Sequence, residues 1–203
     1  MFKNTLIIGC GLIGSSILRS SIKNKISKNF YVFEKSKKKK QIIKKINSKI
    51  IFVSNLNKDI DKMNFIIICT PMSEYKFIIP KINKLKSENY VVTEVGSTKR
   101  NLINLIKNKN FVLSHPIAGS EVSGPTFSDQ DLFNNKWCII INKGKRNKIN
   151  LVKKFWRKIG SKVILMNAKD HDKIFAITSH LPHLIAYNLI KTAQDFQKNE
   201  KKN

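Results

Sequence analysis

A glycine-rich turn near the N-terminus constrains the fold of this chain more than any other feature. The sequence GCGLIGSS, from Gly9 to Ser16, follows the apolar run TLIIG and opens a helical pattern that continues to residue 24. Glycines at this spacing allow a tight strand-to-helix turn and a close approach of the backbone to a pyrophosphate. The helix N-terminus, with its outward N–H groups, would hold that anion. The turn therefore predicts a dinucleotide-binding unit.

The remainder of the chain repeats an alternation of strands and helices. Short apolar runs at 5–9, 30–34, 49–53, 65–70, 90–95, 111–114, 136–142 and 162–166 are separated by amphipathic stretches. This alternation indicates an α/β fold of the Rossmann type, with a mostly parallel, doubly wound sheet covered on both faces. After Met166 the periodicity is helical only, and Asn167 can cap the helix. We predict a nucleotide-binding domain at 1–166 and the first helix of an all-α second domain at 167–203.

Positive charge dominates the composition. The chain has 39 Lys and Arg against 13 Asp and Glu, a formal net charge of +26. An excess of this size is typical of nucleic-acid-binding proteins, which makes DNA or RNA binding the alternative functional class. The lysines, however, are spread along the whole chain among many Asn and Ile residues, and only EKSKKKK at 34–40 forms a cluster. A+T-rich codons encode that set of residues, so we do not expect nucleic acid to be the partner.

Apolar runs and cysteines indicate the compartment. No apolar run approaches the ~18 residues of a membrane span, and the N-terminus does not resemble a signal peptide. Cys10, Cys69 and Cys138 are far apart and form no CxxC pair, which indicates neither a disulfide framework nor a zinc knuckle. We therefore expect a cytoplasmic protein with no metal and no membrane partner.

The second strand ends in a carboxylate that bears on cofactor choice. Glu34 lies twenty residues after Gly14, where a carboxylate can accept hydrogen bonds from the adenosine ribose and repel the extra phosphate of NADP. Lys35 and Lys37 could instead bind that phosphate, so NADP stays an alternative to the favoured NAD. The predicted cofactor-binding residues are Gly9, Gly11, Leu12, Ile13, Gly14, Glu34, Thr70 and Pro71.

Two further stretches place polar side chains at the ends of strands. SHPIAGSEVSGP, at 114–125, follows a strand directly, so His115 would lie at the sheet edge where open α/β folds bind ligands. A histidine in a loop is usually a solvated surface group, but at this edge it is a candidate general base. EVGSTK, at 94–99, would place Ser97 and Lys99 on the same rim, one strand away.

The motif SHLPH, at 179–183, places two histidines on one face of a helix. Pro182 in the same turn removes a backbone donor and predicts a kink. The residues alone are compatible with zinc ligands, ordinary polar residues or an active site. The absence of Cys or acidic partners at ligand spacing disfavours zinc.

Taken together, GCGLIGSS, EVGSTK, HPIAGSEVSGP and HD…SHLPH resemble the prephenate dehydrogenases, including the arogenate and cyclohexadienyl dehydrogenases. The resemblance implies NAD-dependent oxidation of prephenate to 4-hydroxyphenylpyruvate and CO2, a step of tyrosine biosynthesis, with arogenate as the alternative substrate. It implies that His115 contacts the ring hydroxyl as a base and that Ser97 orients it. His183 would contact the substrate with support from His180. Lys99 and Glu121 complete the implied substrate set, and Asp172 matches an acidic position near the cleft.

The chain differs from the family that it resembles at its C-terminal end. Family members continue into a longer helical domain, which supplies most of a dimer interface and an arginine for a substrate carboxylate. We expect this domain to be truncated here and a homodimer to form only if it is completed. An inactive nucleotide-binding protein is therefore a further alternative. If His115 keeps an ordinary pKa of ~6.5, it is mostly neutral at cytoplasmic pH, and activity should rise as it deprotonates.

Overall fold

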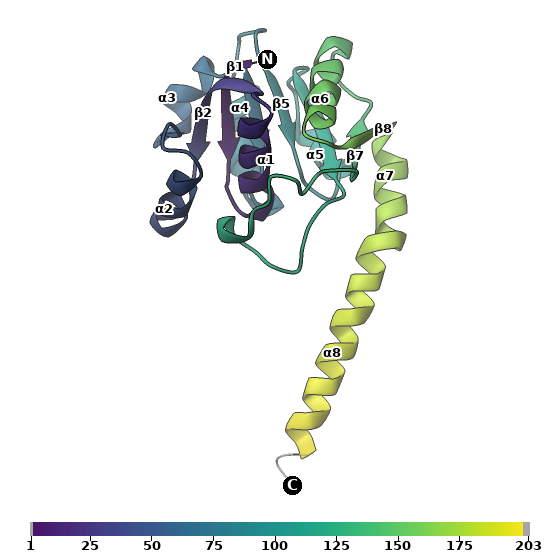
Figure 1. Ribbon diagram of the computed structural model, residues 1–203. Coiled ribbons are helices and arrows are strands. Elements are labelled where there is room, and N and C mark those ends of the chain that lie inside the picture. The colour runs from purple at the N-terminus through teal and green to yellow at the C-terminus, as the bar shows by residue number, and fades with distance from the viewer. Residues whose placement is uncertain (1, 201–203) are drawn as a thin grey trace.

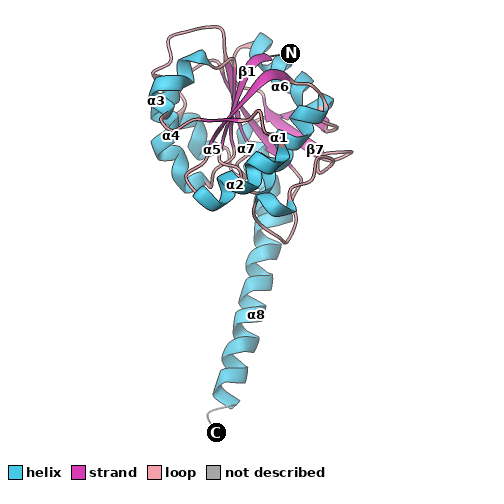
Figure 2. Ribbon diagram, turned by 60° about the vertical axis from the view of Figure 1, so that its left-hand side comes forward, coloured by secondary structure: helices cyan, strands magenta, loops and turns pink. Residues whose placement is uncertain are grey.

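The computed structural model describes residues 2–200, which form an eight-stranded sheet in the order β3-β2-β1-β4-β5-β6-β7-β8, with helices on both faces (Figures 1 and 2). The strands are β1 (Phe2–Ile8), β2 (Ser27–Phe33), β3 (Ile51–Phe52), β4 (Phe65–Ile68), β5 (Val91–Glu94), β6 (Phe111–Pro116), β7 (Trp137–Ile141) and β8 (Lys162–Met166). Strands β1 to β6 are parallel to one another. The predicted Rossmann-type α/β fold is confirmed.

The helices divide between the two faces of the sheet. They are α1 (Leu12–Lys23), α2 (Lys37–Ile46), α3 (Leu56–Asp59), α4 (Tyr75–Asn83), α5 (Arg100–Leu105), α6 (Arg146–Lys158), α7 (Ala168–Phe175) and α8 (Leu181–Glu200). Buried side chains of α1, α2 and α6 form one apolar core, and those of α3, α4, α5 and α7 form the other. Because neighbouring side chains of a strand point to opposite faces, Leu6 and Ile8 of β1 enter one core and Ile7 enters the other.

The direction of the sheet reverses after β6. Strand β7 is antiparallel to β6, with His115 opposite Ile139, and β8 is parallel to β7. To reach a parallel neighbour, the chain must cross back to the opposite end of the strands, whereas an antiparallel neighbour can begin at the end where the previous strand stopped. Only the short 3-10 helix Pro125–Phe127 interrupts the segment between β6 and β7. This segment therefore remains at the carboxyl end of β6, next to the cofactor-binding turn.

The C-terminal helices leave the sheet. From α7 the chain passes through a π-helical turn, Ala176–His180, into α8, which extends away from the remainder of the molecule (Figure 1). This π-helical turn lies just before Pro182, where the sequence predicted a kink, and in it Leu181 N donates to Ala176 O. Proline has no N–H to continue the regular ladder, and π-helical turns inside helices are often found at functional sites. No helix within residues 2–200 is long and apolar enough to cross a membrane. The division into domains at 166 stays a prediction.

Candidate active site

A cleft of about 960 Å³ runs along the carboxyl ends of the parallel strands. It is lined by the turn between β1 and α1, by the ends of β2 and β4, and by Ser123 and Gly124 of the loop after β6. All of the predicted cofactor-binding residues line it except Gly14. Gly14 instead packs against the turn itself, because a Cβ there would lie 2.1 Å from the carbonyl oxygen of Gly9.

The first turn of α1 offers unpaired backbone donors to this cleft. Gly11 is the N-cap residue, and no side chain caps the helix. A Cβ at Gly11 would meet no protein atom within 4 Å, so the space in front of the helix is open. Gly9 adopts φ +86°, a left-handed conformation that favours glycine. An open helix N-terminus of this kind suits a pyrophosphate.

Glu34, directly after β2, lines the cleft. Its Oε2 accepts from Cys10 N at 3.1 Å and its Oε1 accepts from Ser36 N at 3.0 Å, which orients the carboxylate. Each oxygen retains a lone pair for a ribose hydroxyl. The neighbouring Lys35 forms an ion pair with Glu74 at 2.8 Å. This pair lies at the surface, so it leaves Lys35 able to contact an anion as well.

Thr70 gives a second indication that a polar ligand belongs in the cleft. Thr70 lines the cleft beside Pro71. Its Oγ1 is buried and has no hydrogen-bond partner within the part of the chain that the structure describes. Buried hydroxyls are normally paired. The residues present therefore fit a dinucleotide.

A buried ion pair supports the loop after β5. Lys99 and Glu94 are both fully buried, and Lys99 Nζ donates to Glu94 Oε1 at 2.5 Å and to the carbonyl oxygens of Gly96 and Ser114 at 2.7 Å each. Burial raises the pKa of Glu94 and lowers that of Lys99, while their mutual attraction opposes both shifts. All three ammonium protons of Lys99 are used inside the protein.

The location of Lys99 therefore differs from the prediction, which placed it on the rim as a substrate ligand. Its side chain points into the protein because Glu94, the last residue of β5, supplies a buried carboxylate that needs a cation. Ser97 and Glu121 are exposed. Glu121 Oε2 accepts from Ser120 Oγ at 3.2 Å, within its own loop.

His115 lies at the carboxyl end of β6, as predicted from the sequence, but it is not alone. Its Nδ1 lies 2.9 Å from His171 Nε2, and His171 Nδ1 lies 2.7 Å from Asp172 Oδ1. Phe175, one turn further along α7, packs against both imidazoles with ring centroids 5.0 and 4.7 Å away. Helix α7 therefore carries a histidine and an aromatic ring on one face.

The surroundings of His115 keep it neutral. Burial, then the charge of Lys99 and the neighbouring imidazoles of His171 and His180, lower the pKa of His115 to about 3, and Asp172 opposes this shift. Near neutral pH the imidazole is therefore unprotonated and its lone pair is free, while so low a pKa makes it a weaker base than an ordinary histidine. The rise of activity with a titration near pH 6.5, expected from the sequence, is therefore replaced by an expected flat profile between about pH 5 and 8.

The two histidines of SHLPH occupy different environments. His180 is half-buried and close enough to His115 and His171 to lower the pKa of each. His183 is exposed on α8, and its Nδ1 lies 2.7 Å from Ser179 O. Of the two, only His180 acts on the pKa of His115 and His171, and the predicted substrate contact of His183 stays a prediction. Within residues 2–200 no cluster of three metal-ligating side chains is present.

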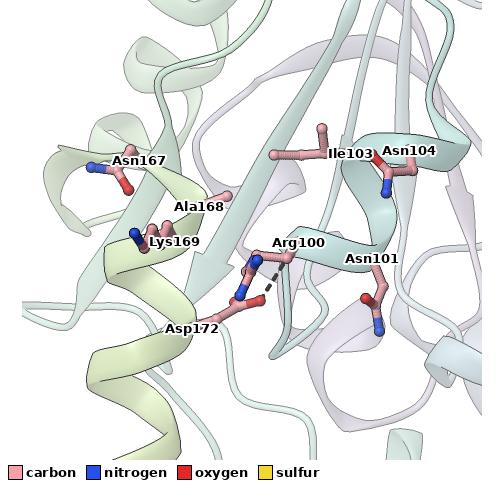
Figure 3. Close-up of a pocket in the computed structure, with 8 residues that line it drawn as sticks. All are labelled: Arg100, Asn101, Ile103, Asn104, Asn167, Ala168, Lys169 and Asp172. Carbon is pink, nitrogen blue, oxygen red and sulfur yellow. Dashed lines mark hydrogen bonds between the residues drawn. The ribbon is translucent and has the colours of Figure 1, made fainter.

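Sequence reasoning gave His171 no role. The only available signal was the pair His171–Asp172, in the first turns of a helix whose cap is Asn167. Asp172 also borders a second hollow of about 680 Å³ between α5 and α7. Figure 3 shows the side chains that line this hollow, which are Arg100, Asn101, Ile103 and Asn104 on one side and Asn167, Ala168, Lys169 and Asp172 on the other.

Comparisons with known proteins identify the family. The family model for the prephenate dehydrogenase nucleotide-binding domain matches residues 19–165, and that for the prephenate dehydrogenase dimerization domain matches residues 167–203. The cyclohexadienyl dehydrogenase of Zymomonas mobilis is 28% identical over 98% of this chain and 70% of its own length. The prephenate dehydrogenase of Lactococcus lactis is 29% identical over 97% of this chain, which spans only 55% of that enzyme.

Solved structures give the same result. The prephenate dehydrogenase of Aquifex aeolicus, in complex with hydroxyphenyl propionate and NAD+, superimposes with a TM-score of 0.84 at 29% identity, over 95% of this chain and 69% of that one. The arogenate dehydrogenase of Synechocystis shares the fold, with a TM-score of 0.77 at 21% identity over 93% of this chain and 68% of that one. Because the two family models together match most of the sequence, this chain belongs to the prephenate dehydrogenase family.

Proposed function

We propose that this protein oxidises prephenate with NAD to 4-hydroxyphenylpyruvate and CO2, in the cytoplasm and as part of tyrosine biosynthesis. The observation that carries the proposal is the position of His115. It lies at the edge of the sheet that bears the nucleotide cleft, with its Nδ1 engaged by His171. Its Nε2 is then available to a substrate, and its low pKa keeps that nitrogen unprotonated.

The proposed chemistry divides between cofactor and protein. Bound NAD would supply the hydride acceptor. His115 Nε2 would take the proton of the C4 hydroxyl as the C4–H bond breaks and its electron pair departs as hydride. Breaking the bond between C1 and its carboxylate then releases CO2 and makes the ring aromatic. His115 would return its proton to the new phenolate oxygen, so no proton is gained or lost overall.

The remaining site residues have proposed roles beside His115. Ser97, exposed on the loop after β5, would orient the hydroxyl. Glu121, on the loop after β6, and the two histidines of SHLPH would bind the substrate. For Lys99 we propose an indirect role, because its positive charge helps to keep His115 neutral.

NAD is the proposed cofactor, with NADP as the alternative. The support is the oriented carboxylate of Glu34. A homodimer is proposed through the helical part, because residues 167–203 match a dimerization domain and α8 exposes Leu184, Tyr187 and Leu189.

The test compares His115→Asn with the unmodified chain for turnover of prephenate and arogenate with each cofactor. We expect the variant to bind NAD normally and to lose about 10²–10⁴-fold in rate, which is the usual contribution of a positioned base. Asparagine can donate a hydrogen bond but cannot take a proton at neutral pH. Lys154→Asn, at an exposed position of α6, is the matched control and should retain full activity.

Two outcomes contradict the proposal. Near-full activity of His115→Asn shows that another group is the base. No turnover of either substrate by the unmodified chain shows that it lacks the activity. Turnover of arogenate alone would reassign the substrate and leave the role of His115 intact.

A further inference from the structure

Asp172 is held as an ionised hydrogen-bond acceptor at the junction of α7 and α5. Its Oδ1 accepts from Lys99 N at 2.8 Å and from His171 Nδ1 at 2.7 Å, and its Oδ2 accepts from Arg100 N at 2.8 Å. Figure 3 shows this carboxylate turned toward Arg100. Although burial acts to raise it, the pKa of Asp172 is lowered because these groups donate to it.

The charge of Asp172 determines where the protons of both imidazoles lie. A carboxylate has no proton to donate, so His171 Nδ1 must be the donor in their 2.7 Å contact. The other nitrogen of a neutral imidazole is an acceptor, so His171 Nε2 receives the hydrogen bond from His115 Nδ1. His115 is then protonated on Nδ1, and its Nε2 carries the lone pair.

We propose that His171 and Asp172 are positioning residues that set the tautomer and the orientation of His115 for proton abstraction. The proposal rests on the proposed function, because it concerns the base of that reaction. A lone imidazole in water favours the opposite tautomer, with its proton on Nε2, and that form could not accept the hydroxyl proton at Nε2. Neither His171 nor Asp172 needs to touch the substrate.

Asp172 also acts on the protonated state of His115 that follows proton abstraction. The titratable groups that act on His115 are Lys99 from the loop before α5, His171 and Asp172 from α7, and His180 from the π-helical turn. Among these only Asp172 favours a positive charge on His115. Phe175 packs against both rings and limits their rotation.

The position of the protons can be measured without turnover. In the whole chain labelled with ¹⁵N-histidine, the two ring nitrogens of His115 should show distinct NMR shifts at pH 7, with Nδ1 protonated and Nε2 unprotonated. His115→Asn assigns the signals. Asp172→Asn supplies an amide that can donate to His171, so it should allow the reversed pattern and yield a mixture of tautomers at His115.

Paired variants of His171 separate the tautomer effect from simple packing. His171→Gln can place an amide oxygen near the former Nε2 and still accept from His115, whereas His171→Phe keeps a ring but has no acceptor. We expect His171→Phe to lose the Nδ1-protonated form and to lower kcat by about 10–10³-fold, below the loss of the base itself. KM and NAD affinity should stay within about twofold, and His171→Gln should recover part of kcat.

The positioning role and the proposed function can be contradicted by different results. An unmodified protein with His115 protonated on Nε2 overturns the positioning role, whether or not the chain turns over prephenate. Equal losses of kcat in His171→Phe and His171→Gln, with unchanged His115 shifts, overturn it as well. If the shifts and their changes are as expected but the unmodified chain has no activity, the positioning role holds and only the proposed function fails.

Discussion

Individual side chains at the sheet edge are held by backbone donors. Glu34 accepts from Cys10 N and Ser36 N, and Asp172 accepts from Lys99 N and Arg100 N. A carboxylate held in this way loses little further freedom when a ligand or an imidazole donates to it. Both acidic residues are therefore fixed in orientation before a ligand binds.

Cofactor choice is tested at Glu34. Replacing Glu34 with Ser removes the acceptors for the ribose hydroxyls and the charge that repels a 2′-phosphate. We expect NAD affinity to fall by about 10- to 100-fold, the value of one or two hydrogen bonds to a charged group, and NADP affinity to rise. Titration calorimetry with both cofactors measures this change. Glu88→Ser, at an exposed carboxylate that pairs with Lys145, is the control. Tighter binding of NADP than NAD by the unmodified chain would contradict the assignment.

At the level of elements, the turn between β1 and α1 was predicted closely. Its glycines act in different ways, however. A side chain at Gly14 would collide with the protein itself, whereas a side chain at Gly11 would enter the open space of the cleft. The π-helical turn before Pro182 was not predicted, because a missing N–H can be accommodated by a kink or by a wider turn, and the neighbouring helices decide between them.

The two glycines predict two distinct phenotypes. Gly14→Ala brings a Cβ into the carbonyl of Gly9, so we expect a loss of more than about 2 kcal/mol in the free energy of unfolding. Gly11→Ala meets no protein atom, so its stability should match that of the control Gly119→Ala, which also has open space. Its NAD affinity should nevertheless fall at least ~10-fold, because the methyl group occupies the approach of the pyrophosphate. Urea unfolding and NAD titration measure the two effects, and normal NAD binding by Gly11→Ala would contradict the cleft assignment.

On the scale of the whole molecule, α7 connects the helical part to the sheet through polar contacts. Asp172 binds the N-terminal end of α5 and His171 contacts the end of β6, while α8 extends beyond them (Figure 1). Movement of the helical part would therefore reach His115 directly. The positively charged side chains, by contrast, are spread along the whole chain, and we assign them no function.

Buried neutral imidazoles predict the acid stability of the fold. Burial lowers the pKa of both His115 and His171 below the ordinary value of 6.5. Below pH 6.5 these two histidines bind protons in the unfolded chain but not in the folded chain. Their contribution to the free energy of unfolding is therefore fully present above pH 6.5 and is lost as the pH falls toward the folded pKa values. Each histidine should contribute up to about 1.4 kcal/mol per pH unit.

The measurement is urea unfolding between pH 7 and pH 5, with His115→Asn as the matched variant. The variant should have a shallower dependence on pH, because one buried imidazole has been removed. An equal slope in both proteins would show that His115 is protonated with little cost in the folded state.

The sequence by itself determined the α/β fold and the cofactor turn, because periodicity and glycine spacing are local properties of the chain. It also placed His115 at the end of its strand. Only the tertiary structure decided what His115 contacts, since His171 and Asp172 lie more than fifty residues away along the chain and belong to helix α7. Lys99 has a local partner, since Glu94 is only five residues away, but its burial also depends on the carbonyl of Ser114 from the next strand and on the packed core that excludes water. Contacts between distant segments depend on how the elements pack, and no local pattern records them.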